Sequence, residues 1–140
     1  MRYVLDCSVA LKWFVPEPLS EQAVDVLHRH QSGVLSLVAP EIVLAQFGHG
    51  LRKDIASRHL SREKGTQVWE DFLAIDVQTV PTRELARRAF PLALDHMATF
   101  YDALYVALAQ REDIKVLTAD ERMTNAFAPL ERTVSLATFK

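Results

Sequence analysis

Apolar and polar positions along the chain fall into two patterns that predict strands and helices in turn. Five short segments are apolar and rich in β-forming residues, which is typical of buried strands. They cover residues 3–6, 34–38, 75–80, 115–118 and 133–136. Helical spacing of apolar residues predicts helices over residues 8–14, 20–33, 41–57, 83–97, 99–109 and 121–127, and one more after Ser61. This alternation predicts an α/β fold with a mostly parallel central sheet covered on both faces.

Capping and helix-breaking residues set the expected helix ends. Ser20 is expected to cap its helix, and Thr99 with Asp102 resembles a capping box in which Asp replaces Glu or Gln. Pro91 lies inside a helical segment, which it is expected to kink or split. The helix after Ser61 is expected to face the core with Val68, Trp69, Phe72 and Leu73.

Three aspartates stand at the ends of well-separated apolar segments. Asp6 closes the first predicted strand, Asp102 begins a strongly apolar helix, and Asp120 follows the fourth predicted strand. Ligands of parallel sheets bind beyond the carboxyl ends of the strands, so these side chains can share one cleft. Their apolar surroundings favour a bound cation, and carboxylate oxygens suit Mg²⁺, a cation that serves phosphoryl chemistry. Each aspartate alone is more simply explained as a helix cap or strand end.

The composition is that of one ordinary globular domain. The chain has 140 residues, of which 49% are hydrophobic, and a formal net charge of -2, which does not by itself indicate nucleic-acid binding. The single cysteine, Cys7, excludes an intrachain disulfide and is interpreted as a small buried residue at a strand end. The first residues predict a core strand rather than a signal peptide, and no apolar run reaches membrane-spanning length. We therefore expect a cytoplasmic protein.

Four segments together resemble a PIN domain, specifically the short prokaryotic type that acts as the toxin of VapBC toxin–antitoxin pairs. They are VLDCSVALKWF at 4–14, APEIVLA at 39–45, YDALYVALA at 101–109 and VLTAD at 116–120. They run in the family's order and span nearly the whole chain. The resemblance implies a single PIN domain over residues 1–140, with a three-layer α/β/α fold.

The same resemblance implies a metal-dependent endoribonuclease. By position, Asp6, Asp102 and Asp120 would be the metal-site acids for Mg²⁺ or Mn²⁺, and Ser8 and Thr118 would be supporting hydroxyls. The implied partners are a cognate VapB-like antitoxin whose tail blocks the cleft, an RNA substrate such as tRNA, and a second copy of the chain in a homodimer. No membrane attachment is implied.

Gln46 is where the sequence departs from the family pattern, although we still assign it to the catalytic site. The family has an acid in the position of Gln46 and usually Asn in the position of His49. Glutamine keeps one carbonyl oxygen but loses the charge, so we expect weaker metal binding, especially at a second site. Glu41 lies well round the helix and is a poor substitute. His49 shares the face of Gln46, and it either favours Mn²⁺ or Zn²⁺ or simply replaces Asn at the pocket wall. Gln46 is a natural divergence or an introduced change, and the neighbouring Gly48 and Gly50 favour divergence.

Two basic groups and one aromatic pair are further candidates. They are Arg52, Lys53, Arg58, Arg62 and Lys64; Arg83, Arg87 and Arg88; and Trp13 with Phe14. The basic groups either contact RNA phosphates or lie on solvated helix faces, and the acidic overall balance favours solvated faces. The aromatic pair either forms an antitoxin surface or is buried in the core or a dimer interface.

Two functions from different classes follow from these observations. The first is a VapC-like ribonuclease toxin with the three aspartates as its acids. The second is a catalytically weakened PIN domain that binds RNA or an antitoxin, because Gln46 replaces an acid. An unrelated α/β phosphatase or receiver domain would need further acids or a lysine at spacings that this sequence lacks.

Overall fold

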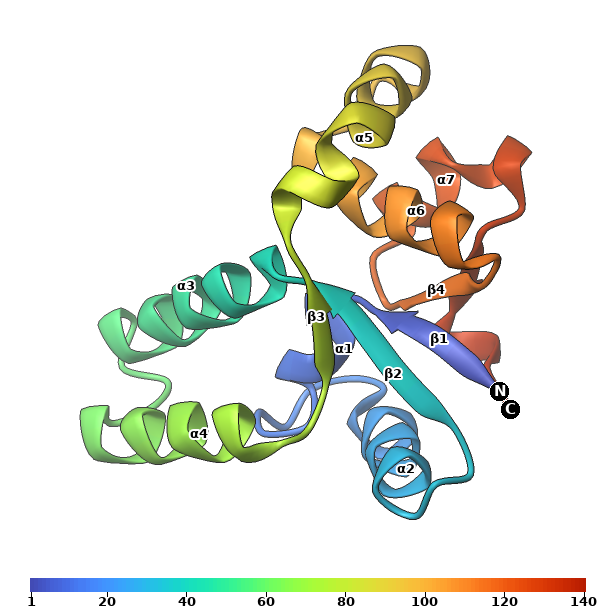
Figure 1. Cartoon of the computed structure of the whole chain (residues 1–140). Helices are drawn as coiled ribbons and strands as arrows, with labels where there is room; N and C mark the ends of the chain where they lie inside the picture. The colour runs from blue at the N-terminus through green and yellow to red at the C-terminus, as the bar shows by residue number, and fades with distance from the viewer.

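A five-stranded parallel sheet forms the centre of the fold (Figure 1). The computed structural model describes residues 1–140, and its strand order is β3-β2-β1-β4-β5. The strands are β1 (Arg2–Leu5), β2 (Ser36–Pro40), β3 (Gln78–Val80), β4 (Lys115–Thr118) and β5 (Thr133–Ser135). Every neighbouring pair is parallel. The predicted α/β class is therefore confirmed, and the sheet is parallel throughout.

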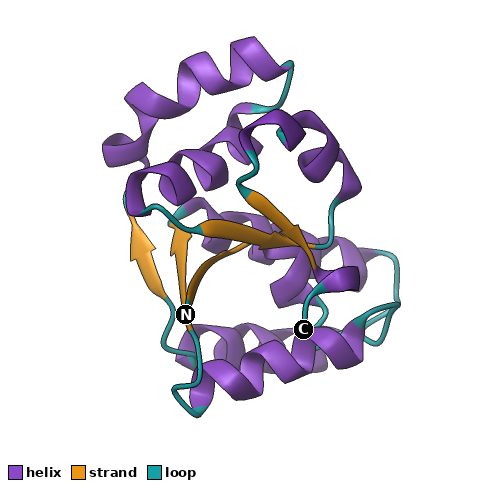
Figure 2. Cartoon of the chain, turned by 90° about the vertical axis from the view of Figure 1, so that its right-hand side faces the viewer, coloured by secondary structure: helices purple, strands orange, loops and turns teal.

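Helices cover both faces of the sheet and make it the middle of three layers (Figure 2). One face packs against α1 (Cys7–Leu11), α2 (Ser20–Gln31), α3 (Ile42–Ala56) and α4 (Arg62–Ala74). The other face packs against α5 (Thr82–His96), α6 (Phe100–Glu112) and α7 (Glu121–Ala126). Two short 3₁₀ helices, Ala128–Leu130 and Leu136–Thr138, flank β5. Adjacent strand residues supply opposite cores, Val4 on the α5–α7 side and Leu5 on the α1–α4 side, because side chains alternate along a strand.

The predicted bounds of β2 and β3 are wrong because the preceding helix ends extend into them. β2 begins and ends two residues later than predicted. The N–H groups of Val34 and Leu35 both donate to the carbonyl of Arg29, so they belong to the turn that ends α2. Gly33 makes this turn with a φ of 79°, which favours glycine. β3 is shorter than predicted because Ile75 still caps α4.

The loop between α1 and α2 also differs from its prediction. The first helix ends at Leu11 rather than continuing to residue 14. Ser20 does not cap α2, because Leu19 is the capping residue, with a φ of 71°. The Ser20 hydroxyl instead accepts a hydrogen bond from the N–H of Glu17 at 3.0 Å and donates to the carbonyl of Val15 at 3.1 Å. Ser20 therefore closes the loop around the prolines.

Pro91 does not split α5, which runs without a break from Thr82 to His96. A proline removes the hydrogen bond to the carbonyl four residues earlier. That carbonyl belongs to Arg87, an exposed residue, so water can satisfy it.

The predicted capping role of Thr99 is confirmed, since its Oγ1 accepts a hydrogen bond from the N–H of Asp102 at 3.0 Å.

Helix α3 approaches its neighbours closely at two glycines. A Cβ on Gly50 would lie 3.1 Å from Cδ1 of Leu11 in α1, and a Cβ on Gly48 would lie 3.3 Å from the Trp69 ring in α4. Both distances are tighter than ordinary contacts, so the glycines let α3 pack against both helices. This packing fixes the face of α3 that lies beside the carboxyl ends of the strands.

An aromatic cluster fills the core on the α1–α4 side. Phe47 stacks on Phe72 with ring centroids 3.8 Å apart. Trp13 is buried and donates from Nε1 to the carbonyl of Ala23 at 2.9 Å, and Phe14 packs edge-on against Phe47. Of the alternatives for this pair, the structure favours burial in the domain core for Trp13, while Phe14 is half-buried against that core. Leu73 does not face the core as predicted, because it is 47% exposed.

Candidate active site

The chain reverses direction across the sheet between β1 and β4. From β1 it runs outward through β2 to β3, and it later returns to the other side of β1 as β4 and β5. The carboxyl ends of β1 and β4 meet at this switch point, where the N–H of Asp6 donates to the carbonyl of Leu117 at 3.1 Å. In open parallel sheets this position is the usual ligand site.

Two hydroxyl groups hold the buried carboxylate of Asp6. Ser8 and Thr118 both donate to its Oδ2, Thr118 at 2.7 Å. The hydroxyls are themselves fixed by backbone N–H groups, since Ala119 donates to Ser8 Oγ at 2.9 Å and Asp120 donates to Thr118 Oγ1 at 3.0 Å. This network ties the segment after β4 to the end of β1. It leaves Oδ1 of Asp6 without a side-chain hydrogen bond.

Asp102 and Asp120 reach the same place from helix starts. Asp102 lies in the first turn of α6, where its N–H donates to Thr99 Oγ1 at 3.0 Å and its side chain is half-buried. Asp120 caps α7, because its Oδ1 accepts from the N–H of Arg122 at 2.9 Å. The Arg122 guanidinium also approaches this carboxylate, with Nη2 3.2 Å from Oδ2. Asp120 is therefore both a helix cap and an ion-pair partner.

The three aspartates line one open cavity of about 670 Å³ together with residues of α3. From α3 come Gln46, His49 and Lys53, and Arg122 lies on the cavity as well. Glu41 is not among the lining residues, because its carboxylate accepts from the N–H of Thr82 at 2.7 Å. The interpretation of Glu41 as a poor substitute for an acid at position 46 agrees with this placement.

Burial and mutual repulsion disfavour charge on two of the carboxylates. Burial raises the pKa of Asp6, and the charge of Asp120 raises it further against the lowering effect of the two hydroxyls. Burial, then Asp6 and Asp120, raises the pKa of Asp102 from 3.8 to about 6, while Arg122 partly opposes the shift. The carboxylates are thus close enough to repel one another. A bound cation would relieve this repulsion.

The side chains fit a hydrated divalent cation better than a bare one. No group of three acidic, histidine or cysteine side chains is arranged to hold a metal ion directly. Mg²⁺ keeps several of its waters and is often bound by only one or two carboxylates. Oδ1 of Asp6, which neither hydroxyl holds, and the carboxylate of Asp102 offer this kind of binding. Asp120 joins them only in competition with Arg122.

Gln46 is engaged by a buried tyrosine that the sequence reasoning missed. The hydroxyl of Tyr105 donates to Gln46 Oε1 at 2.6 Å. Tyr105 is completely buried, and burial followed by the charge of Asp6 raises its pKa well above 10.0, so the hydroxyl stays a donor. Its position three residues after Asp102, on the same face of α6, was the available signal. Arg122, also missed, follows the capping Asp120 by two residues.

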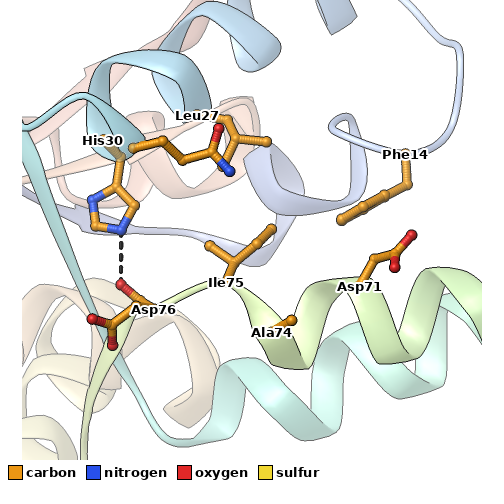
Figure 3. Close-up of a pocket in the computed structure, with 8 residues that line it drawn as sticks. Phe14, Leu27, His30, Asp71, Ala74, Ile75 and Asp76 are labelled. Atoms are coloured by element: carbon orange, nitrogen blue, oxygen red, sulfur yellow. Dashed lines mark hydrogen bonds between the residues drawn. The ribbon is translucent and has the colours of Figure 1, made fainter.

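A second cavity lies between α2 and α4, away from Asp6, Asp102 and Asp120 (Figure 3). Phe14, Leu27 and Ile75 form its apolar part. His30 borders it and bridges two elements, since its Nε2 lies 2.8 Å from the carbonyl of Asp76 and its Nδ1 accepts from a β2 N–H. These two contacts explain His30 as a structural residue that holds its neighbouring elements together. None of the predicted site residues lines this cavity.

The fold and the cavity define a class of protein: parallel α/β domains with grouped carboxylates at the switch point of the sheet. The chain matches the family model of the PIN domain over residues 3–127. It therefore belongs to the PIN domain family. No helix has the length and apolar character needed to cross a bilayer.

Known proteins place the chain near VapC-type members of this family. It is 37% identical over 135 residues to Ribonuclease VapC3 of Pyrobaculum aerophilum, across 93% of this chain and 98% of that protein. Its fold is similar to that of VapBC2 from Rickettsia felis bound to a promoter DNA fragment, with a TM-score of 0.69 and 15% identity over 96% of this chain and 97% of that chain. A toxin–antitoxin complex from Klebsiella pneumoniae matches with a TM-score of 0.67 and 14% identity, over the same shares. The predicted resemblance to VapC-type PIN domains is confirmed.

Proposed function

We propose that this protein is a VapC-like endoribonuclease that cleaves RNA with Mg²⁺ or Mn²⁺ and serves as the toxin of a toxin–antitoxin pair in the cytoplasm. The convergence of Asp6, Asp102 and Asp120 on one cavity carries this proposal. The similarity to a protein named Ribonuclease VapC3 supports it. Structured RNA such as tRNA is the proposed substrate, by analogy with the family.

The side chains of the cavity have distinct roles in this proposal. Asp6 is held through Oδ2 by Ser8 and Thr118, which leaves Oδ1 for the cation, and Asp102 supplies a second carboxylate. A divalent cation held by these acids would activate a water and stabilise the leaving oxygen of the phosphodiester. Asp120 completes the acidic group and keeps the start of α7 in place.

The proposal is tested by RNA cleavage during a Mn²⁺ titration. The unmodified protein should cleave a tRNA substrate as Mn²⁺ rises, and Asp102→Asn should lose at least a hundredfold of that activity, as loss of an electrostatic catalytic group commonly does. Asp76→Asn is the matched control, because Asp76 is exposed and borders the other cavity. Equal activity of the two variants would contradict the proposed site.

A catalytically weakened PIN domain that binds RNA or antitoxin is the second candidate. Two observations favour it: the Gln46 oxygen is taken by Tyr105, and Asp120 is paired with Arg122. A Gln46→Glu variant discriminates between the candidates. If that variant cleaves RNA while the unmodified protein is inert at every Mn²⁺ concentration, the binding function is correct.

We also propose that the protein pairs with a VapB-like antitoxin and forms a homodimer. Helix α5, the residue that follows it and the start of α6 expose four large apolar side chains, Phe90, Leu94, Met97 and Tyr101. Leu94 is 64% exposed and Met97 is 94% exposed, which is typical of a protein interface. Light scattering after gel filtration should give a dimer mass, and Leu94→Glu should shift it to the monomer. Co-purification with the product of an adjacent small gene tests the antitoxin.

A further inference from the structure

The cavity has a second wall whose chemistry differs from that of the three aspartates. It is formed by Gln46, His49 and Lys53 of α3, all of which line the cavity. Their spacing of three and then four residues puts them on one helix face. The close packing of Gly50 against Leu11 fixes that face beside the acids. The wall is therefore a stripe of hydrogen-bond donors next to a group of carboxylates.

Lys53 carries the positive charge of this wall. It is exposed and forms no ion pair with any carboxylate of the chain, although acids line the same cavity. His49 makes no hydrogen bond to the protein, and its imidazole offers an N–H in either tautomer. Both side chains are therefore free to donate to a ligand in the cavity.

Tyr105 determines what Gln46 presents to the cavity. The buried hydroxyl donates to Oε1, so it holds the carbonyl oxygen of the amide on the side of the core. The NH₂ group has no hydrogen-bond partner in the protein, and it is the part of the amide left to face the cavity. Position 46 therefore offers a donor, where a carboxylate would offer acceptors only.

We propose that Gln46 Nε2, His49 and Lys53 form a phosphate-binding wall that holds the RNA backbone beside the acids. This inference deepens the proposed function and depends on it for the choice of RNA as the ligand. Where the family resemblance implies an acid that binds a cation, Gln46 would thus bind an anion. Tyr105 is the positioning residue that keeps the amide in this orientation.

Binding without cleavage tests the wall separately from the nuclease proposal. The probe is a short fluorescein-labelled single-stranded RNA, and its Kd is measured by anisotropy in EDTA over a series of salt concentrations. Lys53→Gln should lower the slope of log Kd against log salt by about 0.7, as expected for one lost phosphate contact. Lys115→Gln is the control, because Lys115 is an exposed lysine at the amino end of β4, away from the cavity.

The amide is tested at constant charge. Gln46→Ala should raise the Kd for RNA about twofold to tenfold, the usual effect of one hydrogen bond, and leave the salt slope unchanged. Gln22→Ala, at an exposed amide on α2, is its control. Tyr105→Phe should reproduce the loss, and the double variant should lose no more than Gln46→Ala alone, because the hydroxyl acts through the amide.

Two results would overturn the inference. One is a Kd and salt slope for Lys53→Gln or Gln46→Ala that match those of its control variant, with thermal melting showing that both are folded. The other is an equal loss of affinity for a short polyglutamate peptide, which would assign the wall to an acidic protein segment. These measurements need no RNA cleavage. They can therefore support or overturn the phosphate-binding wall even if the protein has no nuclease activity.

Discussion

The Arg122 guanidinium is paired with the carboxylate of Asp120, Nη2 to Oδ2 at 3.2 Å, at the edge of the acid-lined cavity. Arg122 is 81% exposed, so the pair is open to solvent. The guanidinium places a positive charge beside Asp120, where a divalent cation would also bind. The arginine and a divalent cation would therefore compete for Asp120.

Removing this competitor should strengthen metal binding. Arg122→Gln is expected to raise the affinity for Mn²⁺ about twofold to fivefold, the range expected for an exposed ion pair. Titration calorimetry on the purified protein measures the change. Arg83→Gln, which removes an exposed arginine on α5, should leave Mn²⁺ affinity unchanged. A lower affinity in Arg122→Gln would show that the arginine supports the cation site.

Metal binding should weaken as the pH falls through about 6. Burial and the charges of Asp6 and Asp120 raise the pKa of Asp102 to that value, and a protonated carboxyl is a poor ligand. Mn²⁺ affinity measured between neutral and mildly acidic pH should therefore drop with a midpoint near 6 at low metal. A midpoint near 3.8, the ordinary value for aspartate, would contradict the repulsion between the acids.

The same pKa shift predicts how stability depends on pH without metal. The folded pKa of Asp102 is raised, so its ionisation costs stability above about 6, and the cost disappears as the pH falls toward 3.8. Asp102→Asn should therefore melt at a higher temperature than the unmodified protein at neutral pH, and the gain should shrink in acid. Thermal melting in EDTA at both pH values measures this. A gain that grows in acid would have the wrong sign.

The hydroxyl of Thr118 should stabilise both the acid it donates to and the segment that follows. Thr118→Val keeps the shape but removes the bond to Asp6 and leaves the N–H of Asp120 without its acceptor. We expect a loss of about 1–3 kcal/mol in the free energy of unfolding and a further rise in the pKa of Asp6. Urea unfolding at neutral pH measures the loss. Thr79→Val, at an exposed position of β3, should change stability by less than about 0.5 kcal/mol.

The stacked pair of Phe47 and Phe72 should be a main support of the α1–α4 side. Phe47 is completely buried, and Phe47→Ala is expected to cost about 3–5 kcal/mol of unfolding free energy. Denaturant unfolding measures it. Val34→Ala, at a residue 61% exposed, should cost less than about 0.5 kcal/mol. A small loss of unfolding free energy in Phe47→Ala would mean that the aromatic cluster repacks to fill the space left by the removed ring.

The sequence by itself determined the class of fold and the residues that meet at the sheet edge. Alternating apolar strands and helices predicted a mostly parallel sheet covered on two faces, and Asp6 and Asp120 follow adjacent strands of that sheet. These features come from local hydrophobic patterns, which sequence shows directly. Strand ends were less predictable, because Val34 and Ile75 are apolar enough for strands yet are held by hydrogen bonds of the preceding helix ends.

Only the tertiary structure decided what each group near the acids does. Tyr105 and Gln46 are 59 residues apart, and nothing in the sequence pairs a core tyrosine with that amide. Only the structure shows that Asp120 caps α7 and that its carboxylate is paired with Arg122. Side-chain orientation depends on contacts between segments that fold together from distant parts of the chain. Local patterns predict which helices and strands form, whereas those long-range contacts fix which atom faces the cavity.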